Sequence, residues 1–220
     1  MHKSTQQSSR LALFDFDGTL CRLNSYHVFL RWLMKRPTPN SLKLMGAVAL
    51  RKAGLVGRPT LLNIALGSLK GKTRAEVELI GKSIFKATLL PNLNKMGIAE
   101  MQKKRDEGYG LVILSGAFDF ILKPFCDFYQ IDHWQSTRLA YTNGICCGHL
   151  EGPEFLGDEK RIYVQNYFSQ SSINWMESCA YSDELVDLPL FSLVGTKILI
   201  LGHRPQQIPY LPENIKRVIW

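Results

Sequence analysis

Two aspartates placed two residues apart are the residues of this chain best suited to chemistry. Asp15 and Asp17 follow the apolar run Leu11–Phe14, and Gly18 then allows the chain to turn. Side chains two apart in a strand share one face, so both carboxylates can lean into one crevice at its end. One could attack a phosphorus atom while the other handles the leaving group's proton, and both would attract Mg²⁺. Aspartate and glycine are also common turn formers, so the pair alone fits either interpretation.

Polar residues suited to phosphate follow the second predicted strand, Leu111–Leu114. Ser115 and Gly116 come directly after it. A serine hydroxyl and free backbone N–H groups at the start of a helix form an anion site. Ser115 could also serve as the N-cap of that helix, and the two roles are compatible.

Lys160 stands in Gly157-Asp158-Glu159-Lys160, at the start of a predicted helix. A lysine at a helix start is disfavoured by the helix dipole, a small cost that a phosphate ligand would offset. The alternative is a surface lysine beside Asp158 and Glu159.

A second pair of acids, Asp183 and Asp187, follows the predicted strand Cys179–Tyr181. If residues 185–190 turn as a helix, the two side chains fall near one face. Asp183 then serves as a metal ligand and Asp187 supports it by hydrogen bonding. The alternative is an N-cap aspartate followed by a solvated acid.

The elements that must position these residues alternate between strands and helices. This alternation predicts an α/β fold with a parallel, doubly wound sheet. Asn143-Gly144 indicates a hairpin turn. The predicted strands are Leu11–Phe16, Leu111–Leu114, Cys179–Tyr181 and Lys197–Leu201, with the hairpin strands Thr137–Tyr141 and Ile145–Leu150; the predicted helices are Asn94–Glu107, Phe118–Phe128, Asp158–Phe168 and Leu188–Val194.

An all-helical segment interrupts this alternation directly after the first strand. Thr73 can cap its last helix, with Glu76 as the partner in a capping box. Pro91 marks the return to alternating elements. The predicted helices of the segment are Leu23–Lys35, Ser41–Gly54, Thr60–Leu69 and Arg74–Leu89.

Four motifs in this chain order resemble those of the haloacid dehalogenase-like hydrolase superfamily, close to its phosphoserine-phosphatase-like branch. The resemblance covers nearly the whole chain. It implies a mostly parallel, Rossmann-like core of residues 1–22 and 91–220, with a helical cap, residues 23–90, inserted after the first strand. The motifs are Asp15-Phe16-Asp17-Gly18-Thr19-Leu20, Leu114-Ser115-Gly116-Ala117-Phe118, Gly157-Asp158-Glu159-Lys160, and Tyr181-Ser182-Asp183 with Asp187-Leu188-Pro189-Leu190.

The resemblance implies that the enzyme hydrolyses a small phosphomonoester in two steps. Asp15 would be the nucleophile that forms an aspartyl-phosphate. Asp17 would be the general acid and then the base that activates water. A covalent intermediate divides hydrolysis into two easier steps.

The resemblance also implies which residues hold phosphate and metal. Ser115, Gly116 and Lys160 would hold the phosphoryl group. Mg²⁺ would be held by the carboxylates of Asp15 and Asp183 and by the backbone carbonyl of Asp17, with Asp187 in support. A carboxylate attacks phosphorus only if the charge of the phosphate is screened, which Mg²⁺ and Lys160 would do.

The chain departs from phosphoserine phosphatases where the predicted cap begins. Those enzymes typically carry a glutamate there that reads the amino group of the substrate, whereas residues 21–27 contain no acid. An amino-acid phosphate is therefore not favoured. Arg22 and His27 would suit an anionic or neutral polar group, unless they are surface residues. Glu184 adds negative charge beside Asp183 and could alter cation affinity.

Composition narrows the class of partner and the compartment. The 220 residues carry a formal net charge of +8, which favours anions such as phosphorylated metabolites. We find no zinc-finger spacing and no motif for specific nucleic-acid binding. The five cysteines form no CxxC pair, which favours free thiols in a reducing compartment. With neither an apolar signal region nor a membrane-spanning run, we expect a cytoplasmic protein.

Three alternatives stay open at this point. A phosphotransferase could use the same intermediate with an alcohol acceptor. A membrane-surface protein could use the basic, partly apolar segment Leu42–Gly57, although a packed cap helix explains that segment as well. A non-catalytic binding module would keep only the fold, against which the four intact charged positions argue. The sequence names neither the leaving group nor the oligomeric state.

Overall fold

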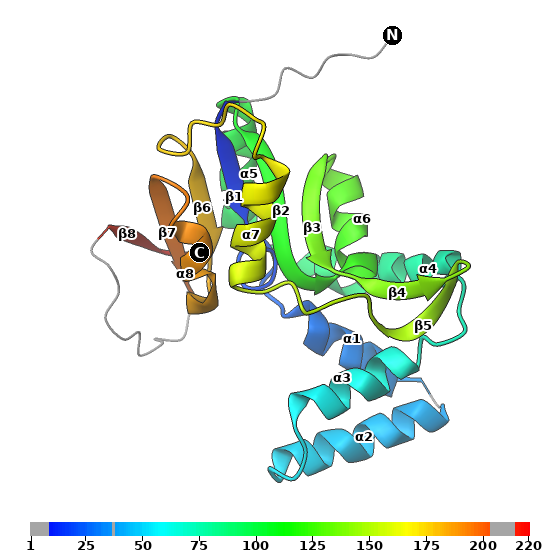
Figure 1. The fold of residues 1–220 in the computed structure, drawn as a ribbon. Helices are drawn as coiled ribbons and strands as arrows, with labels where there is room; N and C mark the ends of the chain where they lie inside the picture. The colour runs from blue at the N-terminus through cyan, green and yellow to red at the C-terminus, as the bar shows by residue number, and fades with distance from the viewer. Residues whose placement is uncertain (1–8, 37, 203–213) are drawn as a thin grey trace.

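A six-stranded parallel sheet forms the centre of the chain in its computed structural model, which describes residues 9–36, 38–202 and 214–220 (Figure 1). Its strand order is β3-β2-β1-β6-β7-β8, and every neighbouring pair is parallel. The predicted fold class is therefore confirmed. The strands are β1 (Leu11–Phe14), β2 (Gly110–Phe118), β3 (His133–Thr137), β6 (Cys179–Ser182), β7 (Thr196–Leu201) and β8 (Ile215–Ile219).

Helices cover both faces of the sheet, and β1 shows why. Its side chains alternate between two apolar clusters, with Ala12 and Phe14 in one and Leu11 and Leu13 in the other. Strands buried on both faces are apolar throughout rather than alternating. The first cluster includes residues of α5 (Lys95–Asp106) and α6 (Asp119–Tyr129), and the second includes residues of α7 (Asp158–Tyr167) and α8 (Leu188–Phe191).

The strand order reverses between β1 and β6. From β1 the chain moves outward through β2 and β3, and it then returns to β6 on the other side of β1. Ligands of open α/β sheets bind at the carboxyl ends of the strands that flank such a reversal. Asp15 lies there, and its backbone N–H donates to the carbonyl of Tyr181 at 2.9 Å. The topology therefore predicts where a functional site should lie.

The segment between β1 and β2 is helical, as predicted. Figure 1 shows α1, α2 and α3 on the side of the sheet where β1 ends. Asn24 caps α1, which therefore begins at Ser25 rather than at Leu23, and Thr73 and Glu76 form the predicted capping box of α4. The helices are α1 (Ser25–Met34), α2 (Pro39–Lys52), α3 (Arg58–Gly67) and α4 (Arg74–Ile84), followed by π-helical and 3₁₀ turns over Phe85–Leu89 and Leu90–Asn92.

Helix α4 and the α3–α4 connection both contact the rest of the chain. Helix α4 packs closely on α6, since Gly81 lies against the backbone of Phe120. The predicted hairpin, β4 (Leu139–Thr142) with β5 (Ile145–Leu150), is confirmed. It joins the α3–α4 connection, where the N–H of Cys146 donates to the carbonyl of Lys72 at 2.8 Å. The division into a core and a cap of residues 23–90 stays a prediction.

Three features of the sheet differ from the sequence-based expectation. Strand β2 extends through Phe118, so Ser115 lies within a strand and is not the N-cap of α6. Strands β3 and β8 were not predicted. Both lie at the edges of the sheet, where exposed positions accept polar residues and weaken the apolar signal.

Within the part of the chain that the structure describes, no helix has the length and apolar character needed to cross a membrane.

Candidate active site

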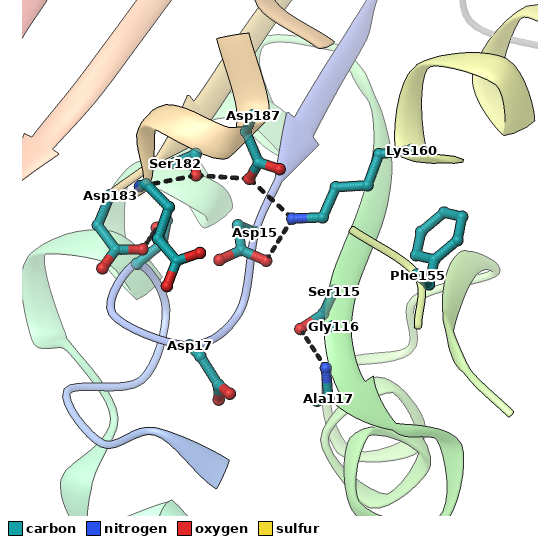
Figure 2. A network of polar contacts seen from close by, with 12 residues as sticks. Asp15, Asp17, Ser115, Gly116, Ala117, Phe155, Lys160, Ser182, Asp183 and Asp187 are labelled. Atoms are coloured by element: carbon teal, nitrogen blue, oxygen red, sulfur yellow. Dashed lines mark hydrogen bonds and ion pairs between the residues drawn. The ribbon is translucent and has the colours of Figure 1, made fainter. Parts of the chain in front are cut away.

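The residues predicted from the motifs meet at the carboxyl ends of β1, β2 and β6 (Figure 2). A cavity of about 390 Å³ opens on this edge of the sheet. Asp183 lies beside Asp15 in the same cluster (Figure 2). The cavity is lined by Asp15, Asp17, Asn24, Tyr26, His27, Arg58, Ser115, Gly116, Leu156, Lys160 and Glu184. All seven predicted site residues are therefore brought into one neighbourhood, and the roles assigned to them stay predictions.

Asp15 is a buried carboxylate held by a buried cation. Its Oδ1 accepts a hydrogen bond from Lys160 Nζ at 2.9 Å, in an ion pair almost closed to solvent. Burial raises the pKa of Asp15 to about 6, and the charge of Lys160 opposes that rise. Asp15 is thus kept ionised near neutral pH in a site that excludes most water.

Lys160 lies between two carboxylates at the start of α7. Its ammonium donates to Asp15 and, at 2.7 Å, to Oδ2 of Asp187. Burial disfavours its charged form, but the two carboxylates outweigh burial and raise its pKa. An ammonium has three N–H donors, and only two have partners among the described residues. The third N–H has no partner among the described residues. Because the side chain of Lys160 is buried, the interpretation of Lys160 as a solvated surface lysine is wrong.

Asp187 supports Lys160 rather than Asp183. Its Oδ2 accepts hydrogen bonds from Lys160 and, at 2.6 Å, from the hydroxyl of Ser182. No hydrogen bond joins Asp187 to Asp183 among the described residues. The expected geometry fails because residues 185–187 form a short 3₁₀ turn, so the two acids do not lie one α-helical turn apart. Ser182 was not predicted to be a site residue, although it stands inside the fourth motif.

One carboxylate oxygen of Asp17 has a hydrogen-bond partner, and the other has none among the described residues. Its Oδ2 accepts a hydrogen bond from the hydroxyl of Ser25 at 2.8 Å, whereas its Oδ1 is buried without a partner among the described residues. Burial, together with the charge of Asp15, raises the pKa of Asp17 to about 7. A carboxyl group with such a pKa can both donate and accept a proton near neutral pH. Sequence reasoning missed Ser25, whose only signal is its place at the start of α1.

Asp183 packs against the turn that follows β1. Gly18 has a positive φ of 74°, and a Cβ there would lie 2.0 Å from Oδ2 of Asp183, so only glycine fits. The hydroxyl of Thr19 lies 3.5 Å from Oδ1 of the same carboxylate. Burial raises the pKa of Asp183 to about 8, and the charges of Asp15 and Glu184 add to that effect. The site thus gathers more negative charge than Lys160 alone can balance.

Ser115 and Gly116 form the wall opposite Asp17. The hydroxyl of Ser115 is buried and accepts a hydrogen bond from the N–H of Ala117 at 3.1 Å. Its own proton is therefore available to a ligand. Gly116 fits closely beneath Leu156, because a Cβ there would lie 2.5 Å from a methyl group of Leu156. Both residues line the cavity where phosphate was predicted to bind.

The oxygen donors of the site fit a hard cation. Carboxylates and backbone carbonyls are the ligands that Mg²⁺ takes in proteins. Across residues 9–36, 38–202 and 214–220, no three His, Cys, Asp or Glu side chains are grouped so as to hold a metal by themselves. The expected set, in which Asp15 and Asp183 offer side chains and Asp17 offers only its carbonyl, stays a prediction. Burial raises the pKa of Asp183 and the neighbouring carboxylates raise it further, and a bound cation would relieve that repulsion.

Comparison with known proteins gives the class to which this site belongs. The family model of the haloacid dehalogenase-like hydrolases matches residues 12–192. The chain therefore belongs to this family, which confirms the resemblance drawn from the four motifs.

Individual relatives agree with this placement. Protein CicA of Caulobacter vibrioides is 27% identical over 85% of this chain and 84% of its own length. A histidinol-phosphatase of Neisseria meningitidis is 21% identical over 86% and 89%. A substrate-bound phosphoserine phosphatase structure superposes with a TM-score of 0.61 at 20% identity, covering 89% of this chain and 87% of that one. The predicted resemblance to the phosphoserine-phosphatase-like branch of the family is confirmed, and so is the predicted class of enzyme, a phosphatase-type hydrolase.

Proposed function

We propose that this protein is a Mg²⁺-dependent phosphatase that hydrolyses a small phosphomonoester through an aspartyl-phosphate on Asp15. The observation that carries the proposal is the buried Asp15–Lys160 pair, with Nζ 2.9 Å from Oδ1, on the wall of a cavity that opens at the strand-order reversal. The histidinol-phosphatase and the phosphoserine phosphatase among the similar proteins support the same class of reaction.

In the first half of the reaction the phosphoryl group moves to Asp15. A carboxylate oxygen of Asp15 forms a bond to phosphorus while the bond from phosphorus to the leaving oxygen breaks. Asp17, in its protonated form, gives its proton to that oxygen, so an alcohol leaves. The pKa of Asp17, about 7, leaves a substantial protonated fraction near neutral pH.

In the second half water releases phosphate. Asp17, now a carboxylate, accepts a proton from a water molecule whose oxygen attacks phosphorus. The bond between phosphorus and Asp15 breaks, and the Asp15 carboxylate is restored. The hydrogen bond from Ser25 fixes the side chain of Asp17 in both halves.

Other residues stabilise the charge of the transferred group. Lys160 directs its free N–H, and Ser115 its hydroxyl, toward oxygens of the phosphoryl group. Mg²⁺, held by Asp15, Asp183 and the carbonyl of Asp17, would supply further neutralisation of the phosphoryl oxygens. Asp187 and Ser182 keep the ammonium of Lys160 in position.

A phosphate-release screen over a broad panel of phosphometabolites with Mg²⁺ tests this function. Wild-type protein should release phosphate from at least one ester. Asp15→Asn should reduce the rate by about a thousandfold or more, because no group remains to form the intermediate. Asp132→Asn, at an exposed site, serves as the matched control and should keep full activity.

Two outcomes would contradict the proposal in different ways. Full activity in Asp15→Asn would refute the nucleophile. Consumption of the ester only when an alcohol acceptor is added, without free phosphate, would make the protein a phosphotransferase instead of a hydrolase.

A further inference from the structure

A larger cavity of about 810 Å³ lies among α1, α2 and α3 and adjoins the active-site cavity. Asn24, Tyr26, His27 and Arg58 line both, so the two cavities share a wall. A phosphomonoester whose phosphate sits at Asp15 would extend its leaving group past these residues. We call the larger cavity the cap cavity. The residues that line it therefore indicate which kind of leaving group would bind there.

The cap cavity is strongly basic. Four cationic side chains line it and, among the described residues, no acidic one does. The cations come from three helices: Arg31 from α1, Arg51 and Lys52 from α2, and Arg58 from α3. Arg31, Arg51 and Arg58 line the same cavity as His27. Burial, together with the charges of these arginines, lowers the pKa of His27.

Beside these cations and the shared residues Asn24, Tyr26 and His27, five apolar side chains line the cap cavity. The hydroxyl of Tyr26 is buried and has no hydrogen-bond partner among the described residues. Such an atom is costly unless something bonds to it. The aliphatic residues of the lining are Leu30, Met34, Val48, Val56 and Leu61.

We propose that the leaving group of the substrate carries a second negative charge and an aliphatic portion, both bound in the cap cavity. This inference rests on the proposed function, since it assumes that the phosphate binds at Asp15. Guanidinium groups bind carboxylates and phosphates through paired hydrogen bonds, which places the second charge at Arg31 and Arg51. Arg58 already pairs with Glu154, whereas no ion pair is found for Arg31, Arg51 or Lys52 among the described residues. A substrate with an ammonium group would meet these three like charges, and a neutral sugar would leave them without an anionic partner.

An amphiphilic anion of this kind can come from a membrane lipid or from a soluble metabolite. Helix α2 lines the cavity with Val48 and Arg51 and exposes Leu42 and Met45 on its surface, at 70% and 51% of their full area. Both sources present the same chemistry to the cavity, and the experiment separates them.

Four matched esters test the proposal: propyl phosphate, octyl phosphate, and the analogue of each with a carboxylate at the far end of the chain. For wild-type protein, kcat/KM for the carboxyoctyl ester should exceed that for octyl phosphate by about tenfold or more, which corresponds to about 1.4 kcal/mol. The octyl ester should in turn exceed the propyl ester. Equal values across the set would overturn the proposal while leaving the proposed function intact.

Substitutions in the cavity lining test which residues cause the preference for the terminal carboxylate. Arg51→Gln and Arg31→Gln should each reduce the ratio between the carboxyoctyl and octyl esters toward one. A general folding defect would lower both rates together and leave that ratio unchanged. Lys43→Gln, on the same helix α2 but outside the cavity lining, is the matched control and should keep the wild-type ratio. An unchanged ratio in both arginine variants would refute the assigned site.

Measuring the binding of substrate analogues tests the cavity assignment even if no ester is hydrolysed. Calorimetry with the corresponding non-hydrolysable octyl phosphonates, with and without the terminal carboxylate, should show the same preference. If no ester is hydrolysed but the preference in binding remains, the proposed function fails and the cavity assignment stands. If both phosphonates bind equally, the cavity assignment fails.

A second pair of assays identifies the source. Co-sedimentation with phosphatidylglycerol vesicles, together with faster turnover of a hexadecyl ester embedded in them, would assign a membrane lipid. Turnover of the soluble octyl ester without vesicle binding would assign a soluble amphiphile. Either result supports the shared chemistry.

Discussion

Lys160 is a buried cation between Asp15 and Asp187, and its charge organises the site. Removing one partner of a buried ion pair costs far more than the pair contributes, because an uncompensated charge stays behind. Burial, together with the charge of Asp15, leaves Asp17 and Asp183 with raised pKa values. Two predictions at the residue scale follow from these buried charges.

Replacing Lys160 by methionine should destabilise the protein by about 3–5 kcal/mol, because Asp15 and Asp187 would then face each other without a cation. Denaturant unfolding without Mg²⁺ measures the change. Adding Asp187→Asn should recover part of the loss, since one of the two stranded charges is removed. Equal stability of Lys160→Met and wild type would contradict the central role of this ammonium.

The metal-free protein should become less stable as pH rises from about 6 to about 8. In that range Asp17 (pKa about 7) and Asp183 (pKa about 8) lose protons that an unfolded chain would already have lost. The folded state binds more protons than the unfolded state there, so its stability falls with pH. Mg²⁺ should restore the thermal midpoint at the upper pH and bind more tightly as pH rises.

Asp183→Asn controls this prediction, because it removes one of the two titrating groups and should flatten the pH dependence. Calorimetry in two buffers with different ionisation enthalpies would show proton release on Mg²⁺ binding. An affinity for Mg²⁺ that is the same at both ends of this pH range would rule the explanation out.

Close backbone approaches at two glycines position the elements around the site. Gly18 brings the turn after β1 onto Asp183, and Gly81 brings α4 onto the start of α6. A Cβ at Gly81 would lie 1.7 Å from the carbonyl oxygen of Phe120, which is backbone and cannot rotate away. Helix α4 is thereby fixed to the helix that leads out of β2.

Gly81→Ala should therefore destabilise the protein by about 1–3 kcal/mol, the usual cost of overpacking, although alanine is the better helix former. Gly46→Ala in α2 is the matched control, because nothing lies within 4 Å of its added Cβ. That change should stabilise the protein by up to about 1 kcal/mol. Thermal unfolding measures the change in stability for both variants. The changes should have opposite signs if Gly81 holds α4 against α6, and the same sign if it does not.

On the scale of the whole molecule, an ion pair joins the helical segment to the parallel-sheet core across the active-site cavity. Arg58 of α3 pairs with Glu154, which precedes the third motif, and the Arg58 guanidinium also lies 4.9 Å from the centre of the Tyr26 ring. Both charged groups are partly exposed, so the pair contributes at most about 1 kcal/mol. It therefore holds α3 near the core only weakly.

Glu154→Gln should leave global stability almost unchanged but speed hydrogen exchange in α3 by up to about fivefold. Glu151→Gln removes a comparable exposed pair, with Arg138, that does not reach α3, and it should leave that exchange unaffected. Exchange measured by mass spectrometry over residues 58–67 distinguishes the two variants. Equal exchange in both would show that the Arg58 pair does not hold the helix.

Much of this molecule could be predicted from local sequence. The Asn143-Gly144 turn and the capping box at Thr73 and Glu76 were predicted correctly, since each depends on near neighbours. The first strand was predicted as Leu11–Phe16 and ends two residues earlier, at Phe14. The edge strands β3 and β8 were missed because half-exposed edge positions lack an apolar pattern. Residues from the helical segment that line the site, such as Tyr26 and Arg58, carried no recognisable local signal.

Local sequence was enough to predict the family and the parallel sheet, and to propose seven candidate site residues, because motif order and strand ends are local features. Only the tertiary structure showed that Asp187 holds Lys160, that Ser115 lies within a strand, and that the cations of three helices converge on one cavity. Those facts depend on how segments far apart in the chain pack together. The physical reason is that burial, which sets both the pKa values and the partners of each charge, exists only in the folded chain.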